Sequence, residues 1–218
     1  MTIFRTPYHI YWLGGSPCSG KSSIAQILAE RYDLLVYSCD GRFNHHRSLA
    51  TPTDQPALHH LGQMSWNDIW MRPVAAQVHS VIEVYREEFP MILADLRTLP
   101  SDRPILVEGA ALLPELVAQQ LQGGQTTTSA TPSAGVYLIP TPAFQHKLYA
   151  QRDWIHGILA QCADPQQAFA NWMARDVGFG QWVAETAVSR DFPVIHVDGN
   201  QTIAQNAVQV AAHFQLRS

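Results

Sequence analysis

Short apolar runs alternate with longer amphipathic stretches along this chain of 218 residues. Five of the runs are almost continuously apolar, which is typical of parallel strands buried on both faces. These runs are His9–Leu13, Leu34–Ser38, Ile105–Glu108, Val136–Ile139 and Val194–Val197. Because helical patterns separate them, the sequence predicts an α/β fold in which a doubly wound parallel sheet has helices on both faces.

Capping residues mark where several of the predicted helices begin. Ser65 and Asp68 have the spacing of a capping box that opens a long apolar stripe, and Pro73 should break or kink that helix. Further N-caps, each followed by proline at the first helical position, are expected at Thr141 and Asp164, and the last helix is expected to run from about Thr202 to Phe214.

Two polar segments interrupt the alternation of strands and helices. Residues 41–64 carry several prolines and histidines between the second strand and the long helix, and Gly123–Gly135 has the composition of a surface loop. The chain shows no internal repeat and no second core. Residues 1–218 are therefore expected to form a single domain.

The segment Gly15–Ser22 reads Gly-Ser-Pro-Cys-Ser-Gly-Lys-Ser, which is a complete phosphate-binding loop between a strand and a helix. Its two glycines let the backbone N–H groups surround a polyphosphate, and the following helix directs its positive end at the same anion. The lysine would reach the β- and γ-phosphates, and the next hydroxyl would bind Mg²⁺. We expect a nucleoside triphosphate, ATP by default, to contact Gly15, Ser16, Pro17, Cys18, Ser19, Gly20, Lys21, Ser22 and Ser23.

Composition limits the partners and the compartment. The net charge of −4 gives no broad electrostatic footprint for nucleic acid, and no basic run indicates an anionic membrane. No apolar run approaches membrane-spanning length, and the N-terminus lacks the apolar core of a signal peptide. Three cysteines without a C-x-x-C pair are typical of reduced thiols. These features favour a cytoplasmic protein, either a monomer or a homodimer.

Two carboxylates follow strands near the expected phosphate site. Asp40 follows the second strand, where it could accept a proton from a substrate hydroxyl or hold Mg²⁺ through water. Glu108 ends the third strand, where it could bind Mg²⁺ through water or contact the acceptor. The alternatives are a turn-capping Asp and a strand-end Glu bonded to backbone N–H groups. Which of the two contacts the metal stays open.

Basic residues could hold an acceptor or cover the transferred charge. Arg42 and Arg47 could bind an anionic or hydroxylated acceptor, which makes residues 41–64 an expected acceptor-site insertion. Arg152, which we expect to close the helix after the fourth strand, and Arg175 could stabilise the leaving charge, although a solvated helix charge is an equal alternative. The histidine pairs could be solvated loop residues or metal ligands, and the spacing favours the former. These pairs are His45-His46 and His59-His60.

The arrangement of Gly15–Ser22, Asp40, Glu108-Gly109 and Arg175-Asp176 resembles the nucleoside- and small-molecule-kinase branch of P-loop proteins. That branch includes uridine kinase, shikimate and gluconate kinases and chloramphenicol phosphotransferase, and the layout is also similar to uncharacterised bacterial ATP-binding proteins. The resemblance implies a three-layer P-loop NTPase fold with sheet order 2-3-1-4-5 and a helical lid, here at about residues 141–182. It also implies that Asp40 is the catalytic base and that Arg152 and Arg175 are lid arginines.

The leading hypothesis is an ATP- and Mg²⁺-dependent kinase that phosphorylates a small metabolite, nucleoside or nucleotide. The alternative is a nucleotide-gated switch or an NTPase without a small-molecule acceptor, although no N-K-x-D guanine motif is present. Phosphorylation of polynucleotide ends is a third class, against which the acidic charge balance argues. A pocket joining Asp40, Arg42 and Arg47 to the phosphate loop would favour the kinase, whereas a flat surface would favour the switch.

Overall fold

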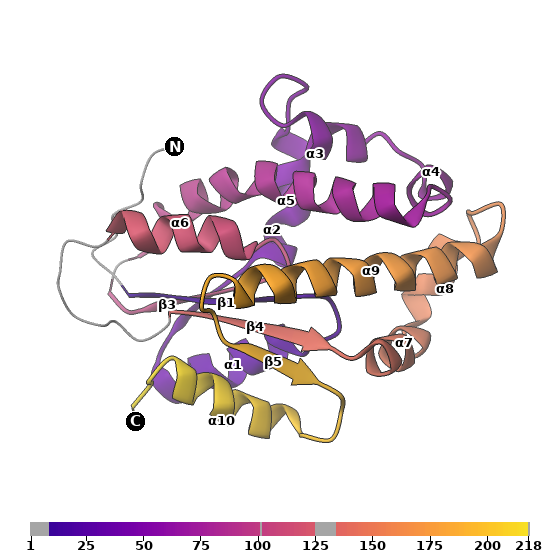
Figure 1. The fold of residues 1–218 in the computed structure, drawn as a ribbon. Helices are drawn as coiled ribbons and strands as arrows, with labels where there is room; N and C mark the ends of the chain where they lie inside the picture. Colours follow the sequence, from indigo (N-terminus) through magenta and orange to yellow (C-terminus); the bar gives the residue numbers. More distant parts are fainter. Residues whose placement is uncertain (1–8, 101, 125–133, 218) are drawn as a thin grey trace.

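A five-stranded parallel sheet forms the centre of the molecule (Figure 1). The computed structural model describes residues 9–100, 102–124 and 134–217. The strands are β1 (Ile10–Gly15), β2 (Leu35–Ser38), β3 (Ile105–Glu108), β4 (Gly135–Pro140) and β5 (Val194–Val197). Their order across the sheet is β2-β3-β1-β4-β5, with every pair parallel. This confirms the predicted sheet and its order.

Helices cover both faces of the sheet and complete three layers (Figure 1). One face carries α1 (Lys21–Tyr32) and α10 (Ile203–His213), and the other carries α5 (Val74–Leu96), α6 (Pro114–Gly124) and α9 (Pro165–Val188).

Neighbouring strand residues point into opposite cores, which explains their continuous apolarity. Trp12 joins the core under α5 and α9, whereas the next residue, Leu13, joins the core under α1 and α10. The same alternation on β3 separates Val107 from Leu106.

Five further helices gather near the carboxyl ends of the strands. They are α2 (Cys39–Leu49), α3 (Pro56–Leu61), α4 (Trp66–Trp70), α7 (Pro142–Ala150) and α8 (Asp153–Leu159). A third apolar cluster, which includes Trp70, Tyr149, Ile155 and Trp172, joins α4, α7, α8 and α9 there. It also contains Cys18 of the phosphate-loop segment, so these helices pack directly against that loop.

The predicted helix starts are confirmed. Ser65 and Asp68 form the capping box of α4, and Pro73 separates α4 from α5 as the N-cap of the longer helix. The other two predicted N-caps, Thr141 and Asp164, also form, and Thr202, near which the last helix is expected to begin, is the N-cap of α10. Each of the three side chains accepts a backbone N–H.

The segment between the second strand and the long helix is more ordered than its polar composition suggested. Residues 39–49 form α2 and residues 56–61 form α3. Arg152 does not close the helix after β4, because α7 ends at Ala150 and Arg152 is the N-cap of α8. The predicted surface loop at Gly123–Gly135 falls largely on residues outside the described ranges. Within those ranges, no helix combines the length and apolarity needed to cross a membrane.

Candidate functional site

The phosphate-loop segment turns sharply between β1 and α1. Gly15 has φ 125°, and a Cβ built there would lie 2.0 Å from the carbonyl oxygen of Leu138 on the neighbouring strand. Gly20, immediately before α1, has φ 82°. Both conformations favour glycine, so the two glycines of the motif stand where the backbone requires them.

Lys21 is directed back into this loop. Its Nζ donates to the carbonyl oxygen of Ser16 at 2.8 Å and to Oγ of Ser19 at 3.3 Å, and the side chain is buried. Burial lowers the pKa of Lys21, while the negative charges of Asp40 and Glu108 act to raise it. An ammonium held by neutral oxygens rather than by a carboxylate can pair with an incoming phosphate.

Glu108 lies beside the start of α1 at the carboxyl ends of three strands. The register places it opposite Leu13 of β1 and Ser38 of β2. Its Oε2 accepts a hydrogen bond from Oγ of Ser22 at 3.2 Å, and its Oε1 accepts one from Oγ of Ser38 at 2.6 Å. The structure thus brings together the two residues predicted to hold Mg²⁺, Ser22 and Glu108.

This group offers only oxygen ligands, the type that Mg²⁺ prefers, so its chemistry fits the ion. Sequence reasoning missed Ser38, although its place at the end of the strand next to β3 was a signal that it would meet Glu108.

Asp40 lies in the first turn of α2, with an exposed side chain. Its charge acts on Lys21 in the phosphate loop. It also acts on Tyr85 of α5, whose pKa is raised by burial first and by the charge of Asp40 second. The carboxylate therefore lies within electrostatic range of both the loop and the helix that faces α2.

Arg42 is held away from the loop by another acid. Its Nε donates to Oδ2 of Asp95 at 2.9 Å, at a largely exposed position. Partial burial acts to raise the pKa of Asp95, but hydrogen bonds from Arg42, Tyr37 and His46 lower it overall. The structure thus places Arg42 in an ion pair with α5 rather than among the residues of a pocket.

His46 is buried, which corrects the expectation of solvated loop histidines at this position. Its Nδ1 lies 3.0 Å from Oε1 of Glu88, and its Nε2 lies 3.1 Å from Oδ2 of Asp95. Both ring nitrogens are therefore engaged, and the contacts fasten α2 to α5. Of the other residues in the two histidine pairs, His60 lines a pocket, His59 is half-buried and His45 is exposed.

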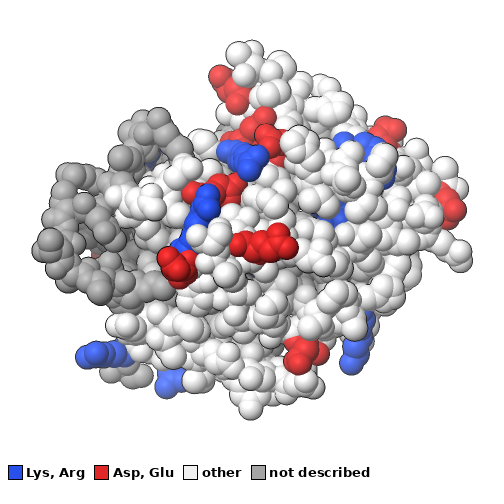
Figure 2. All heavy atoms as spheres, viewed as in Figure 1, with Lys and Arg blue, Asp and Glu red and all other residues white. Residues whose placement is uncertain are grey.

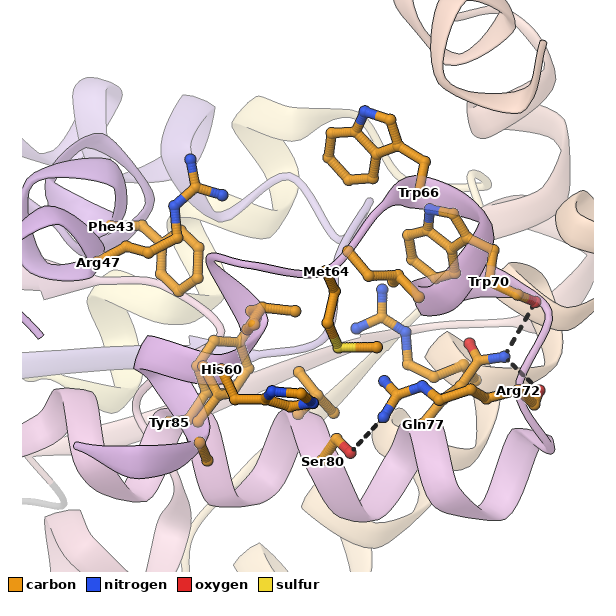
Figure 3. Close-up of a pocket in the computed structure, with 16 residues that line it drawn as sticks. Phe43, Arg47, His60, Met64, Trp66, Trp70, Arg72, Gln77, Ser80 and Tyr85 are labelled. Carbon is orange, nitrogen blue, oxygen red and sulfur yellow. Dashed lines mark hydrogen bonds between the residues drawn. The ribbon is translucent and has the colours of Figure 1, made fainter. Parts of the chain in front are cut away.

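A pocket of about 270 Å³ opens between α2, α3, α4, α5 and α9 (Figure 3). Its walls are mainly apolar and include the aromatic rings of Phe43, Trp66, Trp70 and Tyr85. Among the described residues, no carboxylate lines it, and the arginines that reach it are Arg47, Arg72 and Arg175. Of the predicted acceptor residues, the structure brings Arg47 to this pocket but neither Asp40 nor Arg42.

On α9, Asp176 is buried and Arg175 is half-buried. Nε of Arg175 lies 2.8 Å from Oδ1 of Asp176, and its guanidinium lies 4.9 Å from the centre of the Trp70 ring. The hydroxyl of Tyr149 donates to the other oxygen of Asp176 at 2.8 Å. Burial raises the pKa of Asp176, and the charge of Arg175 is the largest opposing influence. Asp176 thus fixes the arginine that reaches the pocket.

Two further contacts tie α9 and α7 to the phosphate loop. A Cβ built on Gly180 would lie 3.0 Å from Oγ of Ser16, so α9 packs closely against the loop and a larger residue there would require a small shift of the serine. The Nε2 of Gln145 on α7 donates to the carbonyl oxygen of Pro17 at 3.1 Å. Arg152 is also near, because its charge opposes the burial that raises the pKa of Cys18.

Comparison with known proteins adds likenesses of fold at low identity. No protein-family model matches the sequence, and no curated protein matches it. A gluconokinase from Sinorhizobium meliloti 1021 is similar in structure, with a TM-score of 0.42 and 14% identity over 97% of this chain and 94% of that one. Shikimate kinase from Aquifex aeolicus is similar with a TM-score of 0.38 and 14% identity, over 95% of this chain and 96% of that one. An uncharacterized protein from Eubacterium ventriosum is similar with a TM-score of 0.41 and 14% identity, over 96% of this chain and 99% of that one.

The fold of the chain is identified by its own topology. The strand order β2-β3-β1-β4-β5, with the phosphate-loop motif between the central strand and α1, gives the chain the P-loop kinase-like fold.

Proposed function

We propose that this protein is an ATP- and Mg²⁺-dependent kinase that phosphorylates a small molecule. The observation that carries the proposal is the pocket of about 270 Å³, because its Arg175 is paired with Asp176, whose charge interacts with Cys18 and Lys21 of the phosphate loop. A nucleotide switch needs no such pocket, whereas a kinase must hold an acceptor near the γ-phosphate.

The residues around the loop would bind the donor. Backbone N–H groups of the phosphate loop and the ammonium of Lys21 hold the phosphates, as the motif implies. Ser22 and Glu108 would hold Mg²⁺, partly through water, and the ion supplies positive charge beside the phosphates when bound. Lys21, Arg152 and Arg175 would face the charge that develops during transfer, which is where positive groups lower the barrier most.

Asp40 would serve as the base in this scheme. It accepts the proton of the acceptor hydroxyl as the acceptor oxygen bonds to the γ-phosphorus and the bond to the β-phosphate oxygen breaks. Its exposed position in α2 leaves the carboxylate free to meet an acceptor. Its electrostatic influence on both Lys21 and Tyr85, which lines the pocket, supports a position between the donor and the pocket.

The surface is consistent with a small-molecule partner. On the face seen in Figure 2, Lys and Arg are interspersed with Asp and Glu among mostly uncharged residues. A broad basic surface, which nucleic-acid binding needs, is not seen on this face. We propose a cytoplasmic enzyme that works as a monomer or homodimer without a nucleic-acid partner.

The test is ADP release from ATP with a panel of nucleosides, nucleotides, sugar acids and hydroxylated aromatic acids. We expect at least one acceptor to stimulate release, and Lys21→Ala to abolish that stimulation. Lys147→Ala is the matched control, because it removes the chain's other lysine, which is exposed on α7. Asp40→Asn should keep ATP binding and lose transfer. Retained transfer in Asp40→Asn would refute its role as base, and ATP binding without stimulation by any acceptor would favour the regulatory alternative.

A further inference from the structure

We propose that the pocket binds a flat, apolar molecule with a carboxylate at one end and a hydroxyl at the other. The phosphorylation of that hydroxyl rests on the proposed function, whereas binding of the molecule does not. The inference comes from the walls of the pocket, its charges and its unpaired polar atoms.

The walls favour a flat apolar body. Phe43 from α2, Trp70 from α4 and Tyr85 from α5 contribute rings, and Met64 lies among them (Figure 3). Trp70 is held by stacking on Trp172, with ring centres 3.9 Å apart. Aromatic walls fixed in this way favour a ring over a flexible polar chain, because they gain contact area without losing side-chain freedom. The volume is close to the lower end of the range of about 300–1,000 Å³ that is usual for small-molecule pockets.

The charges favour an anion. Among the described residues, no carboxylate lies within ion-pair distance of Arg47 or Arg72, whereas Arg175 is paired with Asp176. Asp68 is close enough to feel the charge of Arg72, but it is exposed and takes its hydrogen bonds from Ser65. The pocket therefore contains positive charge that the described residues leave only partly balanced.

Polar atoms without a partner lie at one end of the pocket, and one of them, Nε of Arg72, is a donor that an anion could use. Gln77 is buried, and its Nε2 donates to the carbonyl oxygens of Trp70 at 3.2 Å and Arg72 at 2.8 Å. This fixes the amide and leaves its Oε1 without a partner. The Nη1 of Arg72 donates to Oγ of Ser80 at 3.1 Å, while its buried Nε has no partner. The unpaired Nε of Arg72 is a donor that suits an anion, whereas Oε1 of Gln77 is an acceptor, which a ligand could satisfy only with a donor group of its own.

A carboxylate fits this end better than a larger anion. One side of the Arg72 guanidinium is committed to Ser80, and a two-oxygen group can use the remaining donors in the same plane. Arg72 and Gln77 lie at one end of the pocket, and Phe43 and Arg47 of α2 lie at the other (Figure 3). Because α2 also carries Asp40, the hydroxyl end would face α2.

Calorimetry on the full chain without ATP tests the binding. The probe is 6-hydroxy-2-naphthoate, with 2-acetyl-6-hydroxynaphthalene as a neutral probe of similar shape and gluconate as a flexible polar acid. We expect the naphthoate to bind about tenfold or more tightly than either comparison probe. Arg72→Gln should remove the preference for the acid over the ketone, whereas Arg103→Gln, an exposed arginine paired with Asp33, should keep it.

Each outcome bears on the proposal. Equal binding of acid and ketone, tighter binding of gluconate, or no binding of any probe would overturn it. The comparison of probes on the natural chain needs no variant, so it stands even if Arg72→Gln fails to fold. Binding of the naphthoate without stimulated ADP release would keep the pocket assignment and count against the kinase. ADP release stimulated only by gluconate would support the kinase and overturn the pocket assignment.

Discussion

Replacing Glu88 with Gln should make the protein more stable at alkaline pH. Glu88 lies on α5, is fully buried and contacts His46 of α2. Burial raises the pKa of Glu88 from 4.5 to about 7, against the opposing influence of His46. The other charged groups around this contact are Asp95, Arg42 and Asp40.

The sign of the effect follows from the raised pKa. A carboxyl that holds its proton more tightly when folded costs nothing at low pH and destabilises the fold as pH rises from 4.5 through about 7. At about 1.4 kcal/mol per pKa unit, the full cost is about 3 kcal/mol. Glutamine resembles the protonated acid in shape and cannot ionise, so the variant avoids this cost.

Urea unfolding followed by tryptophan fluorescence measures the effect between pH 5 and pH 8. The free energy of unfolding of Glu88→Gln minus that of the unaltered chain should rise by about 2.5 kcal/mol over this interval, because a small part of the cost is already present at pH 5. Glu30→Gln, at an exposed position on α1, is the control and should give a difference that does not change with pH. A constant difference for Glu88→Gln, or one that falls as pH rises, would refute the reasoning.

Three other changes test the site and its support. Glu108→Gln should raise the Mg²⁺ concentration needed for half-maximal ADP release by about tenfold, because Ser22 would face a neutral amide. An unchanged Mg²⁺ dependence would remove Glu108 from the metal site. Phe89→Ala should lower the free energy of unfolding by about 3–5 kcal/mol, since the ring is fully buried under the sheet, and a loss below about 1 kcal/mol would contradict this packing. Tyr149→Phe should lower it by about 1–3 kcal/mol by removing the hydroxyl bonded to the buried Asp176, so an unaltered urea midpoint would disprove that contribution.

The parts of the fold that could be predicted from the sequence depend on local patterns. The strands, the helix starts and the phosphate loop are each encoded in a short local pattern, as the capping box of Ser65 and Asp68 illustrates. The order of the strands in the sheet was implied by the resemblance to the kinase branch of P-loop proteins. The closeness of Ser22 and Glu108 also followed from the sequence, because the carboxyl ends of parallel strands meet at one edge of the sheet.

The missed features depend on partners far away in the chain. α2 is mostly polar, and the burial of His46 depends on Glu88, which lies 42 residues later. Arg72 and Gln77 have the pattern of helix-surface residues until α3 and α4 fold over α5 to enclose them. Asp176 lies off the apolar stripe of α9, but that helix is packed on several sides, so even a polar position is covered.

The close approach of α9 to the phosphate loop has a thermodynamic consequence. Gly180 touches Ser16 of the loop, and Arg175, five residues earlier on the same helix, reaches the pocket. A rigid helix that contacts both places cannot shift at one of them without shifting at the other. We expect the nucleotide bound at the phosphate loop and the molecule bound in the pocket to change each other's affinity by the same factor, as linkage requires. The affinity for the nucleotide, measured with and without the pocket ligand, would then show how strongly α9 couples the two binding sites.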